Sequence, residues 1–173
     1  MRSIGAVAGF ALAFASVAAL AGDAKPNDAQ IAHIAYTADQ IDINAAKLAL
    51  QKSKNKEVRD FAENMVRDHT AVNDQALALV KKLNVTPQDN DTSKALVKQA
   101  DAKQAELNKL EGAAFDKAYA DNEVAYHKAV NNALETVLIP NASNTELKGL
   151  LETGLKIFQG HEQHAEQVAQ SLK

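Results

Sequence analysis

The feature that most constrains the fold is the regular spacing of apolar residues in long segments that glycine and proline rarely interrupt. The chain of 173 residues contains only seven glycines and three prolines. Apolar side chains recur at alternating intervals of three and four residues, which is the period of one face of an α-helix. The clearest example is Val58, Ala62, Met65, His69, Val72, Ala76, Leu79 and Leu83. The pattern predicts an all-α protein whose long helices each bury one face.

Capping residues and prolines predict where the helices begin and end. Asn55 is expected to cap a helix, and Ser143 with Glu146 has the spacing of a capping box. Pro140 is expected to stop the helix before it. The predicted helices cover about 28–53, 56–83, 93–110, 114–138 and 144–172. Short connections between the long helices favour antiparallel neighbours, so we expect a four-helix bundle with one additional short helix.

The first 21 residues have the pattern of a secretory signal peptide. Arg2 precedes an apolar run from Ile4 to Leu20, and the run ends in the small-x-small sequence Ala19-Leu20-Ala21. Residues 22–173 are then expected to form a single domain, and no segment in them is apolar enough to span a membrane. The chain has no cysteine, which excludes disulfides and a lipid anchor on cysteine. We therefore expect a soluble periplasmic protein.

The charge balance excludes one class of partner. The formal net charge is −3, and lysines are interspersed with acidic residues. Nucleic-acid binding needs a basic patch that neutralises phosphates, so the sequence predicts no nucleic-acid partner.

Four of the five histidines fall on the apolar faces of their predicted helices. They are His69, His127, His161 and His164. Because a bundle buries these faces, we expect all four side chains to point into the core. His33 shares a line with polar residues and is expected to be solvated. His161 and His164 are three residues apart, which excludes the H-E-x-x-H signature of zinc proteases.

Two carboxylates share this placement on apolar faces. Glu123 lies one turn before His127, and Asp42 follows the apolar line of the helix over 28–53. Buried carboxylates are rare unless they are paired or bound to a cation. One hypothesis is therefore a transition-metal site built from the four histidines with Glu123 or Asp42. The alternative is that each histidine is hydrogen-bonded in the core and that Glu123 and His127 form an ordinary i,i+4 pair.

Three stretches of the sequence resemble a known family. They are KLALQKSKNKEVRDFAENMVRDHT (47–70), AAFDKAYADNEVAYHKAV (113–130) and GHEQHAEQVA (160–169). They resemble the domain-of-unknown-function 4142 family of exported bacterial proteins, which implies a ferritin-like helical bundle over nearly all of residues 22–173. The family's histidines correspond to His69, His127 and either His161 or His164.

The resemblance does not imply a di-iron centre. Ferritin-like metal centres use Glu-x-x-His pairs, but the residues three before His69 and His127 are valines, and the residue three before His164 is a histidine. A set rich in imidazole suits one zinc, copper or nickel ion better than iron.

Two other functions are consistent with the same fold. The first is a non-catalytic stress-related or protein-interaction module whose histidines are structural, with the helix over 93–110 as the surface for a protein partner. The second is an enzyme, but the sequence has no nucleophile elbow, phosphate loop or cysteine site, so no catalytic residue is predicted. The sequence does not determine the oligomeric state.

Overall fold

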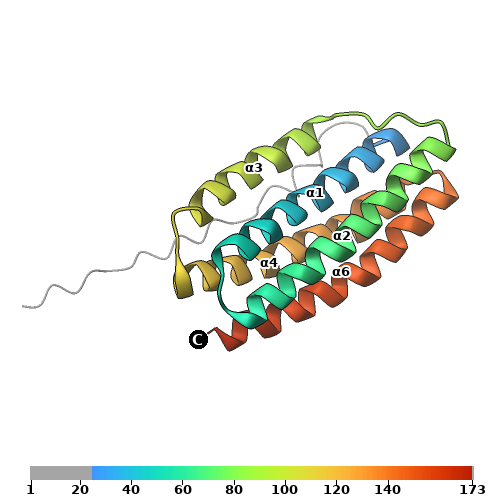
Figure 1. The fold of residues 1–173 in the computed structure, drawn as a ribbon. Coiled ribbons are helices and arrows are strands. Elements are labelled where there is room, and N and C mark those ends of the chain that lie inside the picture. The colour runs from blue at the N-terminus through green and yellow to red at the C-terminus, as the bar shows by residue number, and fades with distance from the viewer. Residues whose placement is uncertain (1–24, 173) are drawn as a thin grey trace, which may run out of the picture.

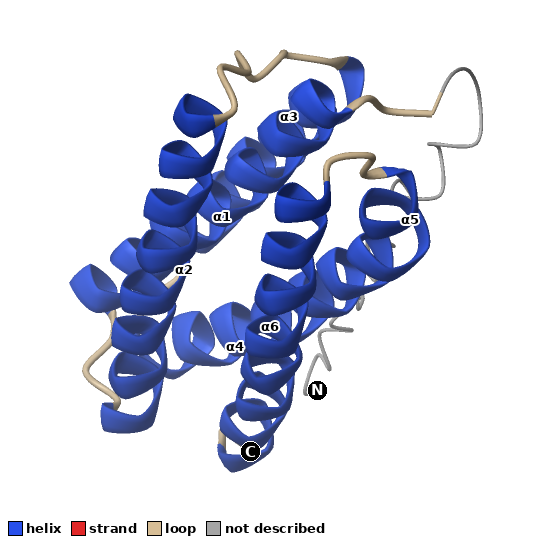
Figure 2. Ribbon diagram, turned by 90° about the vertical axis from the view of Figure 1, so that its right-hand side faces the viewer, coloured by secondary structure: helices blue, strands red, loops and turns tan. Residues whose placement is uncertain are grey.

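The computed structural model describes residues 25–172, and this part of the chain contains helices and no strand (Figure 2). The predicted all-α bundle is confirmed. The elements are α1 (Asp28–Lys52), α2 (Lys56–Lys82), α3 (Asp91–Leu107), α4 (Gly112–Ala133), the π-helix η2 (Leu134–Leu138), α5 (Ile139–Asn141) and α6 (Thr145–Ser171). The predicted signal peptide, residues 1–21, lies outside the described residues.

Four long helices form the bundle, and α3 lies outside it. The helix α1 packs against α2, α4 packs against α6, and α2 also contacts α6. The shorter helix α3 runs alongside α1 on the outer side of the bundle (Figure 1). The predicted antiparallel pairs, joined by short connections, are therefore confirmed.

Asparagine side chains cap most of the helix N-termini. The Asn55 side chain accepts hydrogen bonds from the backbone of Glu57 and Val58, as predicted for α2. Asn144, not Ser143, caps α6, because its side chain accepts from the backbone N–H groups of Glu146 and Leu147. The predicted Ser143–Glu146 capping box is wrong. Ser143 instead donates from its backbone N–H and its hydroxyl to Asp28 of α1, over 2.8 and 2.6 Å.

The end of α4 also differs from the prediction. The chain continues in helical form through Pro140 to Asn141, three residues past the expected end at 138. A proline inside an α-helix clashes with the carbonyl four residues earlier, here that of Thr136. The π-helix at Leu134–Leu138 includes Thr136, and its wider turn accommodates the proline ring. The helix therefore continues past Pro140.

The core consists of two apolar clusters with a polar layer between them. One cluster includes Phe61, Met65, Phe115 and Tyr119, and the other includes Ile31, Leu134, Leu151 and Phe158. On each long helix, the buried polar residues lie between the segments that supply the two clusters. The bundle therefore encloses its polar groups near mid-length, away from both ends.

Among residues 25–172, no helix combines the length and the hydropathy that crossing a membrane requires.

Candidate metal centre

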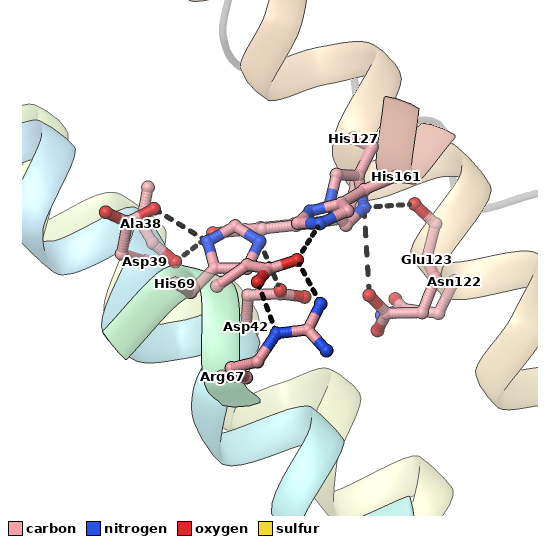
Figure 3. Close-up of polar contacts among 11 residues, drawn as sticks. Ala38, Asp39, Asp42, Arg67, His69, Asn122, Glu123, His127 and His161 are labelled. Atoms are coloured by element: carbon pink, nitrogen blue, oxygen red, sulfur yellow. Dashed lines mark hydrogen bonds and ion pairs between the residues drawn. The ribbon is translucent and has the colours of Figure 1, made fainter. Parts of the chain in front are cut away.

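The buried polar layer gathers six ionisable side chains from the four long helices (Figure 3). None of them is more than 7% exposed, and they are Asp39, Asp42, His69, Glu123, His127 and His161. Groups of this kind are rarely buried without partners or a bound cation.

His69 lies at the centre of the layer, between two carboxylates of α1. Its Nδ1 is 2.8 Å from Oδ1 of Asp39 and forms a hydrogen bond with it. Its Nε2 is 2.8 Å from Oδ2 of Asp42, but this contact is not aligned as a hydrogen bond. Phe158 stacks on the imidazole, with the ring centroids 4.5 Å apart. These three neighbours fix the ring in one orientation.

The other two buried histidines are each held by one ring nitrogen. Nδ1 of His127 is 3.0 Å from the backbone carbonyl oxygen of Glu123, one turn earlier on α4. Nε2 of His161 is 3.0 Å from Oδ2 of Asp68, a partly exposed carboxylate on α2 that also pairs with Arg67. Nε2 of His127 and Nδ1 of His161 have no hydrogen-bond partner. Each ring therefore keeps one buried nitrogen free.

The free atoms converge. One nitrogen from each of His69, His127 and His161 lies within 4.8 Å of the others, and a second group of the same tightness joins Asp42, Glu123 and His127. Both oxygens of Asp42 and Oε2 of Glu123 also lack aligned hydrogen-bond partners. His127 belongs to both groups, so imidazoles and carboxylates border the same small volume.

Burial and neighbouring charges shift the pKa values in the layer, so its groups have different protonation states. Burial alone would lower the pKa of His69, but Asp42 and Asp39 raise it to about 10. Burial likewise opposes ionisation of Asp42, yet attraction to His69 holds the pKa of Asp42 below its usual range. His69 and Asp42 therefore form a buried ion pair at neutral pH.

Burial raises the pKa of Asp39, and the hydrogen bond to His69 opposes this shift. Glu123, His127 and His161 are neutral in this environment. Burial, and then the charge of Asp42, raise the pKa of Glu123 well above its ordinary value. Burial lowers the pKa of His127. Burial also lowers the pKa of His161 to about 4, and the positive charge of His69 adds to this effect. Two neutral imidazoles and one protonated carboxyl thus adjoin the His69–Asp42 pair.

The structure brings together five of the six residues singled out in the sequence. His164 is the exception: it is half-buried and packs edge-on against Phe61, with the ring centroids 5.1 Å apart. His33 also differs from expectation, because it is half-buried and its Nδ1 is enclosed without a partner. The predicted polar face of α1 is covered by α3, which accounts for this burial.

Sequence reasoning missed Asp39 and Asp68, the carboxylates that orient His69 and His161. Asp39 lies three residues before Asp42 and four after Ala35, so its helical position next to the apolar line of α1 could have indicated it. Asp68 directly precedes His69 and points along α2 toward α6, a contact that depends on how the two helices pack.

These features define a class of protein: an all-α bundle with a histidine and carboxylate layer at its centre. The chain belongs to the family described as "Domain of unknown function (DUF4142)", whose model matches residues 13–168. The predicted family is thus confirmed.

The chain is also similar to a solved structure described as "CopM in the Cu(II)-bound form". The two are 14% identical, the match covers 87% of this chain and 100% of that chain, and the TM-score is 0.66. At this identity the likeness supports the shared fold. No curated protein matches the chain.

Proposed function

We propose that this protein binds one transition-metal ion, with Cu(II) as the first candidate, through His69, His127 and His161. The observation that carries the proposal is the convergence of one imidazole nitrogen from each of three helices within 4.8 Å in the core. Asp42 or Glu123 would supply a carboxylate ligand from the other side of His127.

The donor chemistry narrows the choice of metal. Imidazole suits zinc, copper and nickel, and nitrogen and oxygen donors together suit Cu(II). The chain has no cysteine to supply thiolate for Cu(I). The Cu(II)-bound state of the structurally similar CopM adds support for copper. Iron is less well supported, because the layer lacks the Glu-x-x-His pairs of di-iron bundles.

The hydrogen bonds of the three histidines support this proposal. Metal-binding histidines usually hydrogen-bond through the ring nitrogen that does not bind the metal. Asp39, the Glu123 carbonyl and Asp68 occupy that position for His69, His127 and His161. The nitrogens left over are the ones that lack aligned hydrogen bonds.

A metal would have to displace protons. His127 and His161 are neutral and can bind at once, whereas His69 and Glu123 carry protons at neutral pH. Binding should therefore release protons, and affinity should rise with pH.

The role is proposed as metal binding in the periplasm, without catalysis. Export rests on the signal-peptide pattern of residues 1–21. The rival interpretation, a stress-related or interaction module with structural histidines, is favoured by one observation: His69 already has a carboxylate against each nitrogen.

Equilibrium dialysis of the purified protein against Cu(II), and separately against Zn(II), tests the proposal. The chain offers a matched control, because His33 and His164 are half-buried histidines outside the converging group. Wild type and the double variant His33→Ala/His164→Ala should each bind about one ion per chain. His69→Ala/His127→Ala should lose metal affinity by at least about 100-fold, since removing a residue that only hydrogen-bonds to a ligand can already cost about 10- to 100-fold.

Two outcomes would contradict the proposal. One is negligible uptake of both metals by wild type. The other is equal loss of affinity in the two double variants, which would mean that the three converging histidines are not the specific site. The electron paramagnetic resonance spectrum of the copper-loaded wild type should also show coupling to imidazole nitrogens, and His69→Ala/His127→Ala should lose it.

A further inference from the structure

A large cavity lies between α1 and α3, and two of its wall residues, Asp39 and Phe158, also contact His69. Its volume is about 930 Å³, and α4 and α6 complete its wall. The lining is mostly apolar and includes Leu48, Leu96, Leu134 and Leu151. A volume of this size falls within the range of about 300–1,000 Å³ that is typical of small-molecule sites.

The cavity exists because α3 is anchored at its ends and not along its length. Its only buried residues are Ser93 near the N-terminus and Leu107 at the C-terminus. Ser93 is held in a reciprocal cap with Asn90, and Leu107 joins the apolar core. Between these anchors the lining includes small side chains on three helices, which are Ala35, Ala38, Ala95, Ala100, Ala129 and Ala133. The helices therefore leave space where larger side chains would have filled it.

The charge of the wall limits what the guest can be. Asp39, Asp91 and Asp101 line the cavity, against one cation, Lys103. Asp91 and Asp101 are exposed and Lys103 is only half-buried, so the buried part of the wall offers no cation to an anionic guest. A polypeptide segment is disfavoured as well, because α3 covers the cavity along its length.

We infer that this cavity binds one uncharged, predominantly apolar small molecule. An apolar cavity of this volume lowers stability when it is empty and holds water poorly, so an apolar guest gains by filling it. The inference does not rest on metal binding, because none of the three histidines lines the cavity.

Titration of the protein with N-phenyl-1-naphthylamine, a neutral fluorophore with one N–H donor, tests the inference. Wild type should show saturable fluorescence enhancement with one site per chain. Ala100→Trp on α3 should weaken binding by at least about tenfold, because the indole would occupy the cavity. Ala102→Trp is the matched control, since Ala102 lies two residues away on α3, is exposed and does not line the cavity.

Circular dichroism establishes that each variant is folded. If Ala100→Trp does not fold, Ala35→Leu fills the same cavity from α1 and should meet the same criterion. Absence of saturable binding to wild type would overturn the inference. So would equal affinity of the cavity-filling variant and Ala102→Trp.

Displacement of the fluorophore identifies the charge of the preferred guest. 1-Dodecanol should displace it at a lower concentration than dodecanoate, because the wall carries three aspartates and one lysine. Stronger displacement by dodecanoate would contradict an uncharged guest.

Discussion

At the scale of single residues, Asp42 and Glu123 show how neighbours decide the charge of a buried carboxyl group. Both are almost fully buried in the same layer. Asp42 lies 2.8 Å from Nε2 of His69 and stays ionised because of that cation. Glu123 has no comparable partner, and the negative charge of Asp42 raises its pKa further. One carboxyl group is therefore half of an ion pair, and the other is a neutral acid.

This difference predicts unequal effects of two similar substitutions on the metal-free protein. Asp42→Asn leaves the His69 cation without its nearest buried partner and should lower the free energy of unfolding by about 3–5 kcal/mol. Glu123→Gln replaces one neutral group by another of similar volume and should change it by less than about 1.5 kcal/mol. Urea denaturation at pH 7 with a chelator measures both. Equal losses would contradict the assigned charge states.

At the scale of elements, the start of α6 depends on Asn144. Its side chain accepts from two backbone N–H groups that have no other partner in the first turn. Ser143 instead joins α6 to the start of α1 through Asp28, and that contact is exposed. The two neighbouring residues thus have different roles.

Alanine substitution should distinguish these roles. Asn144→Ala removes the cap and should lower the free energy of unfolding by about 1 kcal/mol, within the range of about 0.5–2 kcal/mol for lost caps. Ser143→Ala should change it by less than about 0.5 kcal/mol, as expected for an exposed contact. Thermal unfolding of both variants shows which substitution lowers the stability more. A larger loss for Ser143→Ala would support the capping box that the sequence suggested.

The sequence predicts most of the elements because helices depend on local spacing. The apolar period located all four long helices, and Asn55 marked the start of α2 as expected. The period did not reveal the π-helix before Pro140, since a single wide turn barely changes the spacing of apolar residues. The Ser143 error arose because two residues that both favour N-caps are adjacent, and only the path of the chain decides between them.

For the candidate site, the sequence predicts which side chains are buried but not all of their contacts. Burial of His69, His127, His161, Asp42 and Glu123 follows from helical phase. Phase also placed His164 inward, but His164 lies at the edge of the buried face of α6, where it contacts Phe61 and not the polar layer. The contacts of Asp39 and Asp68 with histidines depend on the register between helices, which a single helix cannot specify.

At the scale of the whole molecule, the position of the polar layer links its charges to global stability. Apolar clusters lie on both sides of the layer, so its groups exchange with water only when the bundle opens. Any difference between their folded and unfolded pKa values therefore makes the free energy of unfolding depend on pH.

The histidines of the layer affect the stability of the metal-free protein in opposite directions on the two sides of pH 6.5, the ordinary pKa of histidine. His127 and His161 have lowered pKa values in the folded state, so their contribution is complete above pH 6.5 and is lost as the pH falls toward about 4. His69 has a pKa raised to about 10, so its contribution is complete below pH 6.5 and is lost as the pH rises toward that value. Burial raises the pKa values of Glu123 and Asp39, so these two carboxyl groups lose their contribution as the pH rises and oppose the two histidines on the acid side.

Above pH 6.5 the titration of His69 should therefore lower the melting temperature, whereas below pH 6.5 the two histidines and the two carboxyl groups act in opposite directions. We would measure the melting temperature from pH 4.5 to 9.5 with a chelator present. His161→Gln should lose less stability than wild type as the pH falls from 6.5 to 4.5 and should keep the alkaline side, because only an acid-side titration is removed. His164→Gln is the matched control and should keep the full curve, since His164 lies outside the layer. A melting temperature that rises steadily above pH 6.5 would contradict the ion pair between His69 and Asp42, and an unchanged acid side in His161→Gln would contradict the neutral, buried state of His161.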